Sequence, residues 1–278
     1  MTSKNTLIAM TMIALGILLA LVGYFSGGRW LIFKDADGLH VPSHTNLVSQ
    51  SHELDTFTSI NIVNDYGDIE IIARDNDYRL ETQVFEQQDV TYHIDNGVLT
   101  IETKAKKRDG FQFGFNNFSS PSIKLYVPKD TKVESVVIDS DFGDTAVRGL
   151  HYEELQLMQD YGDITFTNTT GDKTEITQSF GDLTLQQYAS NGISIESEHG
   201  DITIDGTLNG QSTISSSFGD MTLHLQNKQS DLGYDLKTSF GDITMDGEEQ
   251  SGKVTQVTNG DHQLHVSLSH GDLDVSLK

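Results

Sequence analysis

Cysteine is absent from this chain of 278 residues, proline occurs three times and tryptophan once. The absence of cysteine excludes a disulfide framework, a zinc–thiolate site and a thiol nucleophile. Basic residues are scarce as well, because 18 lysines and arginines stand against 41 acidic residues and give a net charge of −23. Nucleic acid binding needs a basic face that neutralises phosphates. The composition therefore argues against nucleic acid and favours cationic partners.

In place of these residues the chain carries a repeated phrase, apolar-x-apolar-x-x-x-aromatic-Gly-Asp-apolar-x-apolar. Its Gly-Asp pairs are Gly67, Asp68, Gly143, Asp144, Gly162, Asp163, Gly181, Asp182, Gly200, Asp201, Gly219, Asp220, Gly241, Asp242, Gly271 and Asp272. The step between phrases is constant from Gly143 to Gly219 and becomes longer before Gly241 and again before Gly271. A fixed period of about 19 residues indicates a solenoid.

The phrase predicts local structure. Apolar residues two positions apart indicate strands with one buried face, and Gly fits a turn that needs a positive φ. We therefore predict an all-β, parallel β-solenoid with two short strands in each coil of about 19 residues. A second turn is expected within the repeat, as at residues 189–192 and 209–210. Stacked coils would align the aromatic residue before each Gly into a ladder of rings.

The repeated Asp has two interpretations. It folds its carboxylate onto nearby backbone N–H groups and caps the turn, or the stacked carboxylates bind Ca²⁺. Calcium takes six to eight oxygen ligands, whereas this chain has one Gly-Asp per coil, which favours capping. The ten histidines are scattered, and His262 and His265 have no third ligand at a convincing spacing. We predict no metal site, no cofactor and no catalytic residue.

An apolar run covers residues 6–25. Twenty residues of helix span about 30 Å, the thickness of the hydrocarbon core of a bilayer. We predict an uncleaved transmembrane anchor, and the alternative is a cleaved signal peptide. Lys4 on one side and Arg29 with Lys34 on the other leave the charge rule for orientation balanced. We expect an extracytoplasmic C-terminal domain on a single-pass cell-membrane protein, with intracellular attachment as the alternative.

The rest of the chain divides by pattern. Residues 1–5 form a short tail, residues 26–52 a linker, residues 53–132 an irregular N-terminal β cap and residues 133–278 the regular solenoid repeats. Within the cap, residues 90–102 predict a β-hairpin that turns at Asn96-Gly97. Solenoids need atypical ends to close their stacks, which explains an irregular cap.

One segment of the cap is basic and aromatic. It contains Lys104, Lys106, Lys107, Arg108, Phe111, Phe113, Phe115 and Phe118. Basic residues beside exposed aromatic residues bind anionic lipid headgroups or wall polymers. The alternative is a loop whose phenylalanines cover the open end of the core. The sequence alone leaves both interpretations open.

The anchor, the hairpin with its basic loop, the strand at residues 123–130 and the serial Phe-Gly-Asp phrases resemble the bacterial "putative adhesin" family of β-strand-repeat proteins. The resemblance covers residues 54–278. It implies a protein of the Gram-positive cell envelope, in some cases linked to the response to cell-wall antibiotics. It carries over no catalytic residue.

We therefore predict a non-enzymatic binding or adhesion protein of the bacterial envelope. Its predicted partners are the membrane and anionic lipids, wall polymers, cationic peptides or an envelope protein. A structural stalk without a specific ligand is the main alternative. A carbohydrate-active enzyme is another, and it would need a unique constellation of side chains in a groove. The acidic residues here are explained by the repeat itself.

Overall fold

The computed structural model describes residues 12, 16, 31–35, 38–40, 47–74, 77–85, 88–105, 111–114, 121–250, 252–258 and 260–278. The chain divides into two compact units, residues 1–45 with 107–119 and residues 46–106 with 120–278. The predicted transmembrane segment, residues 6–25, lies outside the described residues except for Met12 and Gly16. Within the described part of the chain, no helix is long and apolar enough to cross a membrane.

The first unit contains a three-stranded antiparallel sheet, in the order β2 (Gly38–His40), β1 (Leu31–Asp35), β9 (Phe111–Gly114). Residues 26–52, predicted to be a linker, contain β1, β2 and the start of β3. β1 forms because its backbone groups pair with those of β9, far along the chain, where Ile32 lies opposite Phe113. No local pattern in the sequence predicts this pairing.

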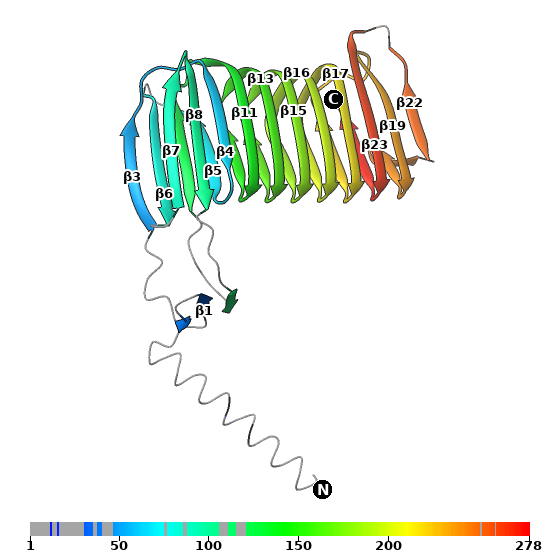
Figure 1. The fold of residues 1–278 in the computed structure, drawn as a ribbon. Coiled ribbons are helices and arrows are strands. Elements are labelled where there is room, and N and C mark those ends of the chain that lie inside the picture. The colour runs from blue at the N-terminus through cyan, green and yellow to red at the C-terminus, as the bar shows by residue number, and fades with distance from the viewer. Residues whose placement is uncertain are drawn as a thin grey trace, which may run out of the picture. The chain divides into compact units, whose positions relative to one another are not determined.

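The second unit is built almost entirely of strands, which confirms the all-β solenoid prediction (Figure 1). Its strands are β3 (Leu47–Glu53), β4 (Ser59–Asn64), β5 (Asp68–Ala73), β6 (Arg79–Phe85), β7 (Gln88–Asp95), β8 (Val98–Ala105), β10 (Ser122–Val127), β11 (Lys132–Phe142), β12 (Thr145–Arg148), β13 (His151–Tyr161), β14 (Ile164–Thr167), β15 (Thr170–Phe180), β16 (Leu183–His199), β17 (Ile202–Phe218), β18 (Met221–Leu225), β19 (Leu232–Phe240), β20 (Ile243–Met245), β21 (Glu248–Gln250), β22 (Lys253–Gln256), β23 (His262–His270) and β24 (Leu273–Leu277).

The first regular coils each have one short and one long strand, and in β16 and β17 the two join into one strand of 17 residues, whereas two short strands were predicted. A four-residue strand such as β14 follows the Gly-Asp turn, and an 11-residue strand such as β15 leads to the next turn. Like positions of neighbouring coils pair in parallel, as Ile164 does with Leu183. The second turn also begins earlier than predicted, at positive-φ residues such as Asn168 and Gln187. Residues 189–192 lie inside β16, where the register shifts.

The coils at the C-terminal end do not stack in chain order. β23 pairs with β17 on one side and with β19 on the other, so Val266 lies between Ile214 and Leu236. β24 lies between β18 and β20 in the same way. The last phrase of the sequence therefore forms the penultimate coil, as the red strand between yellow and orange strands shows in Figure 1. A prediction from the order of the phrases in the sequence would place this coil last in the stack.

Antiparallel strands close both ends of the solenoid. At the N-terminal end the coil of β8 and β10 lies outside the coil of β4 and β5. The predicted hairpin is present there as β7 and β8, with Asn96 and Gly97 at φ values of 50° and 80°. β3 and β6 extend the other side of the cap, and β21 and β22 close the far end. Antiparallel end strands limit further parallel stacking.

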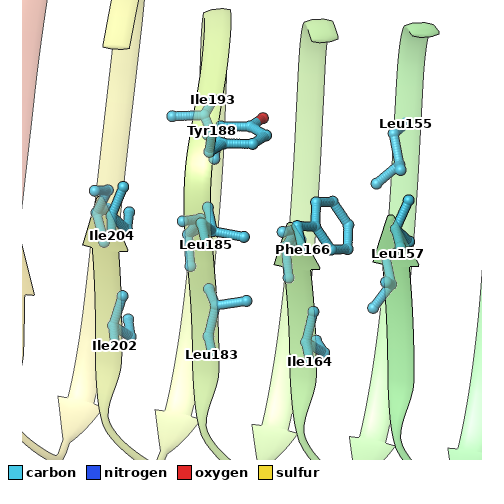
Figure 2. Packing of buried hydrophobic residues seen from close by; sticks show 14 of the residues in the cluster. Leu155, Leu157, Ile164, Phe166, Leu183, Leu185, Tyr188, Ile193, Ile202 and Ile204 are labelled. Carbon is cyan, nitrogen blue, oxygen red and sulfur yellow. The ribbon is translucent and has the colours of Figure 1, made fainter. Parts of the chain in front are cut away.

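The core is a set of columns of buried apolar side chains, one column for each inward position of the phrase. Figure 2 shows Leu157, Ile164 and Leu183 among the side chains of this core, and Ile164 of β14 lies opposite Leu183 of β16 in the neighbouring coil. A cluster of hydroxyl groups interrupts the columns: the Tyr188 hydroxyl lies 2.6 Å from the Thr174 hydroxyl and 3.2 Å from the Tyr152 hydroxyl. Burial raises the pKa of both tyrosines. The hydrogen bonds offset the cost of burying these hydroxyl groups.

Candidate functional site

The feature that stands out on the surface is a row of stacked rings along the edge where the Gly-Asp turns lie. Neighbouring ring centroids are 4.7–5.1 Å apart and neighbouring planes differ by 3–14°. In stacking order the rings belong to Phe142, Tyr161, Phe180, His199, Phe218, His270 and Phe240. We call these seven side chains the ring row. Its spacing is the distance between hydrogen-bonded strands.

The ring row is exposed. Phe180 retains 40% of its accessible surface, Phe142 46% and Phe240, at the end of the row, 68%. Each inner ring has its two faces covered by its neighbours, so solvent reaches mainly the ring edges. Tyr66, at the same position of the next coil, is 45% exposed. Exposed aromatic side chains that are contiguous along several coils form a candidate interaction surface.

The turn glycines hold the coils close enough for this stacking. All eight adopt φ values between 123° and 148°, which other residues rarely adopt. A Cβ built on Gly181 would lie 2.0 Å from the carbonyl oxygen of Gly162 in the neighbouring coil. No side chain fits there, so the aromatic-Gly-Asp order places every ring at the same height along the edge.

The aspartates form a second row beside the rings. The carboxylate Oδ1 of each Asp accepts a hydrogen bond from the backbone N–H of the Asp in the next coil, at N–O distances of 2.8–3.1 Å. The chain of acceptors runs Asp68, Asp144, Asp163, Asp182, Asp201, Asp220 and Asp272, which accepts from Asp242. The bonds therefore link coils, whereas the sequence predicted caps within one turn. Burial raises the pKa of Asp68, which terminates this row.

On the other side of the ring row the charge is uneven. Asp65, Asp139, Asp141 and Asp160 come from β11, β13 and the turn after β4, next to Phe142 and Tyr161. Partial burial raises the pKa of Asp141, and the charges of Asp65, Asp160 and Asp139 add to the shift. In later coils most equivalent positions hold serine, as at Ser217, Ser239 and Ser269. The edge is therefore acidic at its N-terminal part and rich in hydroxyl groups at its C-terminal part.

Inward-facing polar side chains support the turns from behind. Asn64 donates to the Gly67 carbonyl at 2.7 Å, and Gln178 donates to the Gly162 carbonyl at 2.8 Å. Thr103 in turn donates to the Asn64 Oδ1 at 2.6 Å. Sequence reasoning missed these residues, although the signal was present: a polar residue recurs three positions before most of the glycines. They fix the glycine carbonyls against which the next coil packs.

The described residues on either side of the predicted basic and aromatic segment lie at this same edge. Ser122 lies opposite Asp68 and Thr103 lies opposite Asn64. Lys104 belongs to the described residues, and its Nζ lies 2.9 Å from Glu102 Oε2. Lys106, Lys107, Arg108, Phe115 and Phe118 lie outside the described residues, as do the side chains of Phe111 and Phe113 in β9.

The histidines that the structure describes do not gather at one site. His199 and His270 are members of the ring row, and His262 accepts a hydrogen bond from the Gly210 N–H through Nδ1 at 3.0 Å. Across the described ranges no three His, Asp or Glu side chains gather in a group that would hold a metal ion. The ring row and its flanking carboxylates form the candidate site.

Comparison with known proteins assigns the repeat region to a family. The family model described as Toastrack DUF4097 matches residues 57–208 and 193–276. No curated protein matches the chain.

Among solved structures, a "putative adhesin" from Bacteroides fragilis is similar, with 13% identity over 86% of this chain and 100% of that chain and a TM-score of 0.47. A "putative cell adhesion protein" from Clostridium sporogenes has 10% identity over 84% and 100% of the two chains, with a TM-score of 0.41. A "putative lipid binding protein" from Parabacteroides distasonis has 15% identity over 84% and 97%, with a TM-score of 0.47.

Proposed function

The chain belongs to the Toastrack DUF4097 family, and we propose that it is a non-enzymatic binding protein of the bacterial cell envelope. In this proposal it acts in adhesion or in the response to envelope stress. Residues 6–25 anchor it in the cell membrane, and the solenoid lies on the extracytoplasmic side. The observation that carries the proposal is the exposed ring row with carboxylates on its flanks.

The site favours a ligand that is both apolar and cationic. Covering the ring edges removes apolar surface from water, which stabilises a complex by about 25 cal/mol per Å². The Asp row and the acidic residues near Phe142 and Tyr161 favour positive charge at the same place. The net charge of −23 steers such a ligand toward the protein. A cationic amphipathic peptide, free or as part of an envelope protein, has this chemistry.

The repetition of the site supports a non-enzymatic role. Between the two ends of the Asp row, each carboxylate accepts the same hydrogen bond from the next coil. Catalysis by carboxylates needs two groups whose environments differ, so that one is protonated and the other ionised. Binding needs no such difference between groups, and equivalent groups repeated along the edge each add a contact to the same ligand.

A calorimetric titration tests the ligand class. A fragment of residues 31–278, which keeps every described strand, is titrated with a helical Lys/Leu peptide and with its Glu/Leu counterpart at low salt. We expect binding of the cationic peptide only. The variant Asp141→Asn/Asp160→Asn should bind it at least 10-fold more weakly, while the matched variant Asp231→Asn/Asp261→Asn, with the same charge change elsewhere, should not. Without binding of the cationic peptide, the structural stalk becomes the better interpretation.

The anchor and the location need a separate experiment in cells. We expect the full chain in the membrane fraction and its C-terminal end accessible to protease added to intact cells without a wall. Removal of residues 1–30 should release the protein from the membrane. Protection of the C-terminal end would place the solenoid in the cytoplasm, and release of an intact, shortened wild-type chain would indicate a cleaved signal peptide.

Anionic lipids or wall polymers are proposed as a second class of partner, bound through Lys104, Lys106, Lys107 and Arg108. Each cation near an anionic surface contributes about 1 kcal/mol. The 31–278 fragment should therefore bind phosphatidylglycerol vesicles at low salt and ignore phosphatidylcholine vesicles. Replacing the four cations with Gln should abolish this binding while the circular dichroism spectrum stays unchanged. A fragment that ignores both kinds of vesicle contradicts this role.

A further inference from the structure

A groove of about 320 Å³ runs along the outer face of the solenoid beside the C-terminal part of the ring row. Its lining comes from β15, β16, β17 and β23, four strands that are neighbours in the stack. We define the hydroxyl groove by Ser215, Ser217, Ser267 and Ser269 with Glu196 and Glu198. This groove is distinct from the acidic part of the edge, which lies near Phe142.

The groove exists because small side chains replace large ones in adjacent coils. Ser215 of β17 lies between Glu196 of β16 and Ser267 of β23. Lys237 of β19 lies next to Ser267 on the far side. Longer side chains therefore stand on both sides of the serines along the stack. Ser217 and Ser269 directly precede ring-row residues in the sequence, so one long side of the groove follows the ring row.

The chemistry of the lining selects the ligand. A serine hydroxyl both donates and accepts hydrogen bonds, and a carboxylate accepts them. The lining contains no lysine or arginine among the described residues, and its two charges are the negative ones of Glu196 and Glu198. These groups match hydroxyl groups and disfavour anions.

We propose that the hydroxyl groove binds a neutral polyhydroxylated polymer, a linear polysaccharide lying along the stack of coils. Successive coils present hydroxyl or carboxylate groups about 4.8 Å apart, so the sugar units of one chain meet equivalent groups in turn. Linked weak contacts add up to useful affinity. The inner ring faces are covered by their neighbours, so hydrogen bonds rather than ring stacking supply the recognition. This ligand class and this site go beyond the proposed binding of cationic peptides.

Cosedimentation with insoluble neutral polysaccharides tests the proposal. The full chain, in a detergent without a sugar headgroup, is mixed separately with chitin, cellulose and curdlan. We expect it to sediment with at least one of them, and the bound fraction to change less than twofold in about 1 M NaCl, where the Debye length is about 3 Å. Hydrogen bonding to a neutral ligand persists at this salt concentration, whereas the peptide binding proposed above does not.

The variant Ser215→Tyr/Ser267→Tyr fills the groove, and we expect at least a 10-fold loss of bound protein. The variant Thr203→Tyr, on the outward face of the same β17 strand but on the other side of the solenoid, serves as the matched control and should bind like the wild type. A third variant, Glu196→Gln/Glu198→Gln, removes acceptors without adding bulk and should reduce the bound fraction even if the tyrosine variant misfolds. Sedimentation with none of the three polysaccharides, or equal binding by the groove and control variants, overturns the proposal.

Discussion

The central coils and the C-terminal coils of this solenoid use the same phrase but differ in how chain order relates to stacking order. From β11 to β17 each coil packs on the one that follows it in the sequence. At the C-terminal end, β23 and β24 insert between coils that precede them in the sequence. The ring row and the Asp row continue through this exchange without a break. The phrase therefore makes any two coils able to stack on each other. The order of the stack follows the order of the chain only where the connections between coils are short.

The largest expected effect comes from removing the inserted coil. A chain that ends at residue 258 lacks β23 and β24, including Leu264, Val266, Leu268, Leu273 and Val275, all of which are buried. Burial of each such side chain contributes about 1.5–3 kcal/mol, so the loss is on the order of 10 kcal/mol. We expect amide hydrogens of β19 and β20 to exchange as in an unfolded chain. Retained protection there would contradict the exchanged order.

A second test compares two glycines. At Gly181, in a central turn, a Cβ would meet a carbonyl oxygen at 2.0 Å, whereas at Gly252, near the C-terminal end, nothing described lies within 4 Å. Gly181→Val should lower the free energy of unfolding by more than about 3 kcal/mol, and Gly252→Val by about 1–3 kcal/mol from its positive φ alone. Chemical denaturation measures both. Equal effects would mean that the close contact between turns does not constrain the central coils.

The ring row allows a third comparison. Phe218 stacks on two rings, and Phe240 stacks on one at the end of the row. Each aromatic pair contributes about 0.5–1.5 kcal/mol beyond area burial. Phe218→Ala should therefore destabilise the protein by about 1–3 kcal/mol, roughly twice the effect of Phe240→Ala, as measured by thermal unfolding. A larger effect at Phe240 would place the end of the row elsewhere.

The uneven charge along the edge predicts a smaller, pH-dependent effect. Burial and neighbouring carboxylates raise the pKa of Asp141 above the ordinary 3.8. A raised pKa means that ionised Asp141 opposes folding, so its favourable contribution is present below the ordinary pKa and is lost as the pH rises through the folded pKa. Asp141→Asn should stabilise the protein at pH 7 by less than about 1 kcal/mol, because the group is largely exposed.

The stabilisation by Asp141→Asn should fade as the pH falls below 4. Ser217→Asn, at the equivalent position of a later coil, is the matched control and should show no such pH dependence. Thermal melts of both variants between pH 3 and 7 measure the difference. A gain that does not vary with pH would point to a packing effect in place of charge.

The smallest effect is expected from calcium. One carboxylate oxygen of each Asp in the row from Asp68 to Asp272 already accepts a backbone N–H, so the row contributes fewer free oxygens than calcium coordination demands. The melting temperature in millimolar Ca²⁺ should match that in EDTA. A clear rise with Ca²⁺ would mean selective binding to the folded state and would favour the cation-ladder interpretation.

The sequence by itself determined the features that depend on neighbouring residues. Period-2 apolar positions, glycines at a required positive φ and an Asn-Gly hairpin turn each act over a few residues, and the structure contains all three. The recurrence of an aromatic residue before each Gly was sufficient to predict a ladder of rings, because parallel coils place equal positions about 4.8 Å apart. The polar residues behind the turns had the same periodic signal.

Only the tertiary structure decided which coil packs on which, because equivalent phrases are interchangeable partners and a long connection allows either order. It also decided that the Asp carboxylates accept hydrogen bonds from backbone N–H groups of the neighbouring coil, and that β1 pairs with β9. The hydroxyl groove depends on serines of β17 and β23, which are separated in the sequence by all of β18 to β22 and are adjacent in the stack. Contacts of this kind depend on the packing of segments that are distant in the sequence, and local sequence patterns do not determine them.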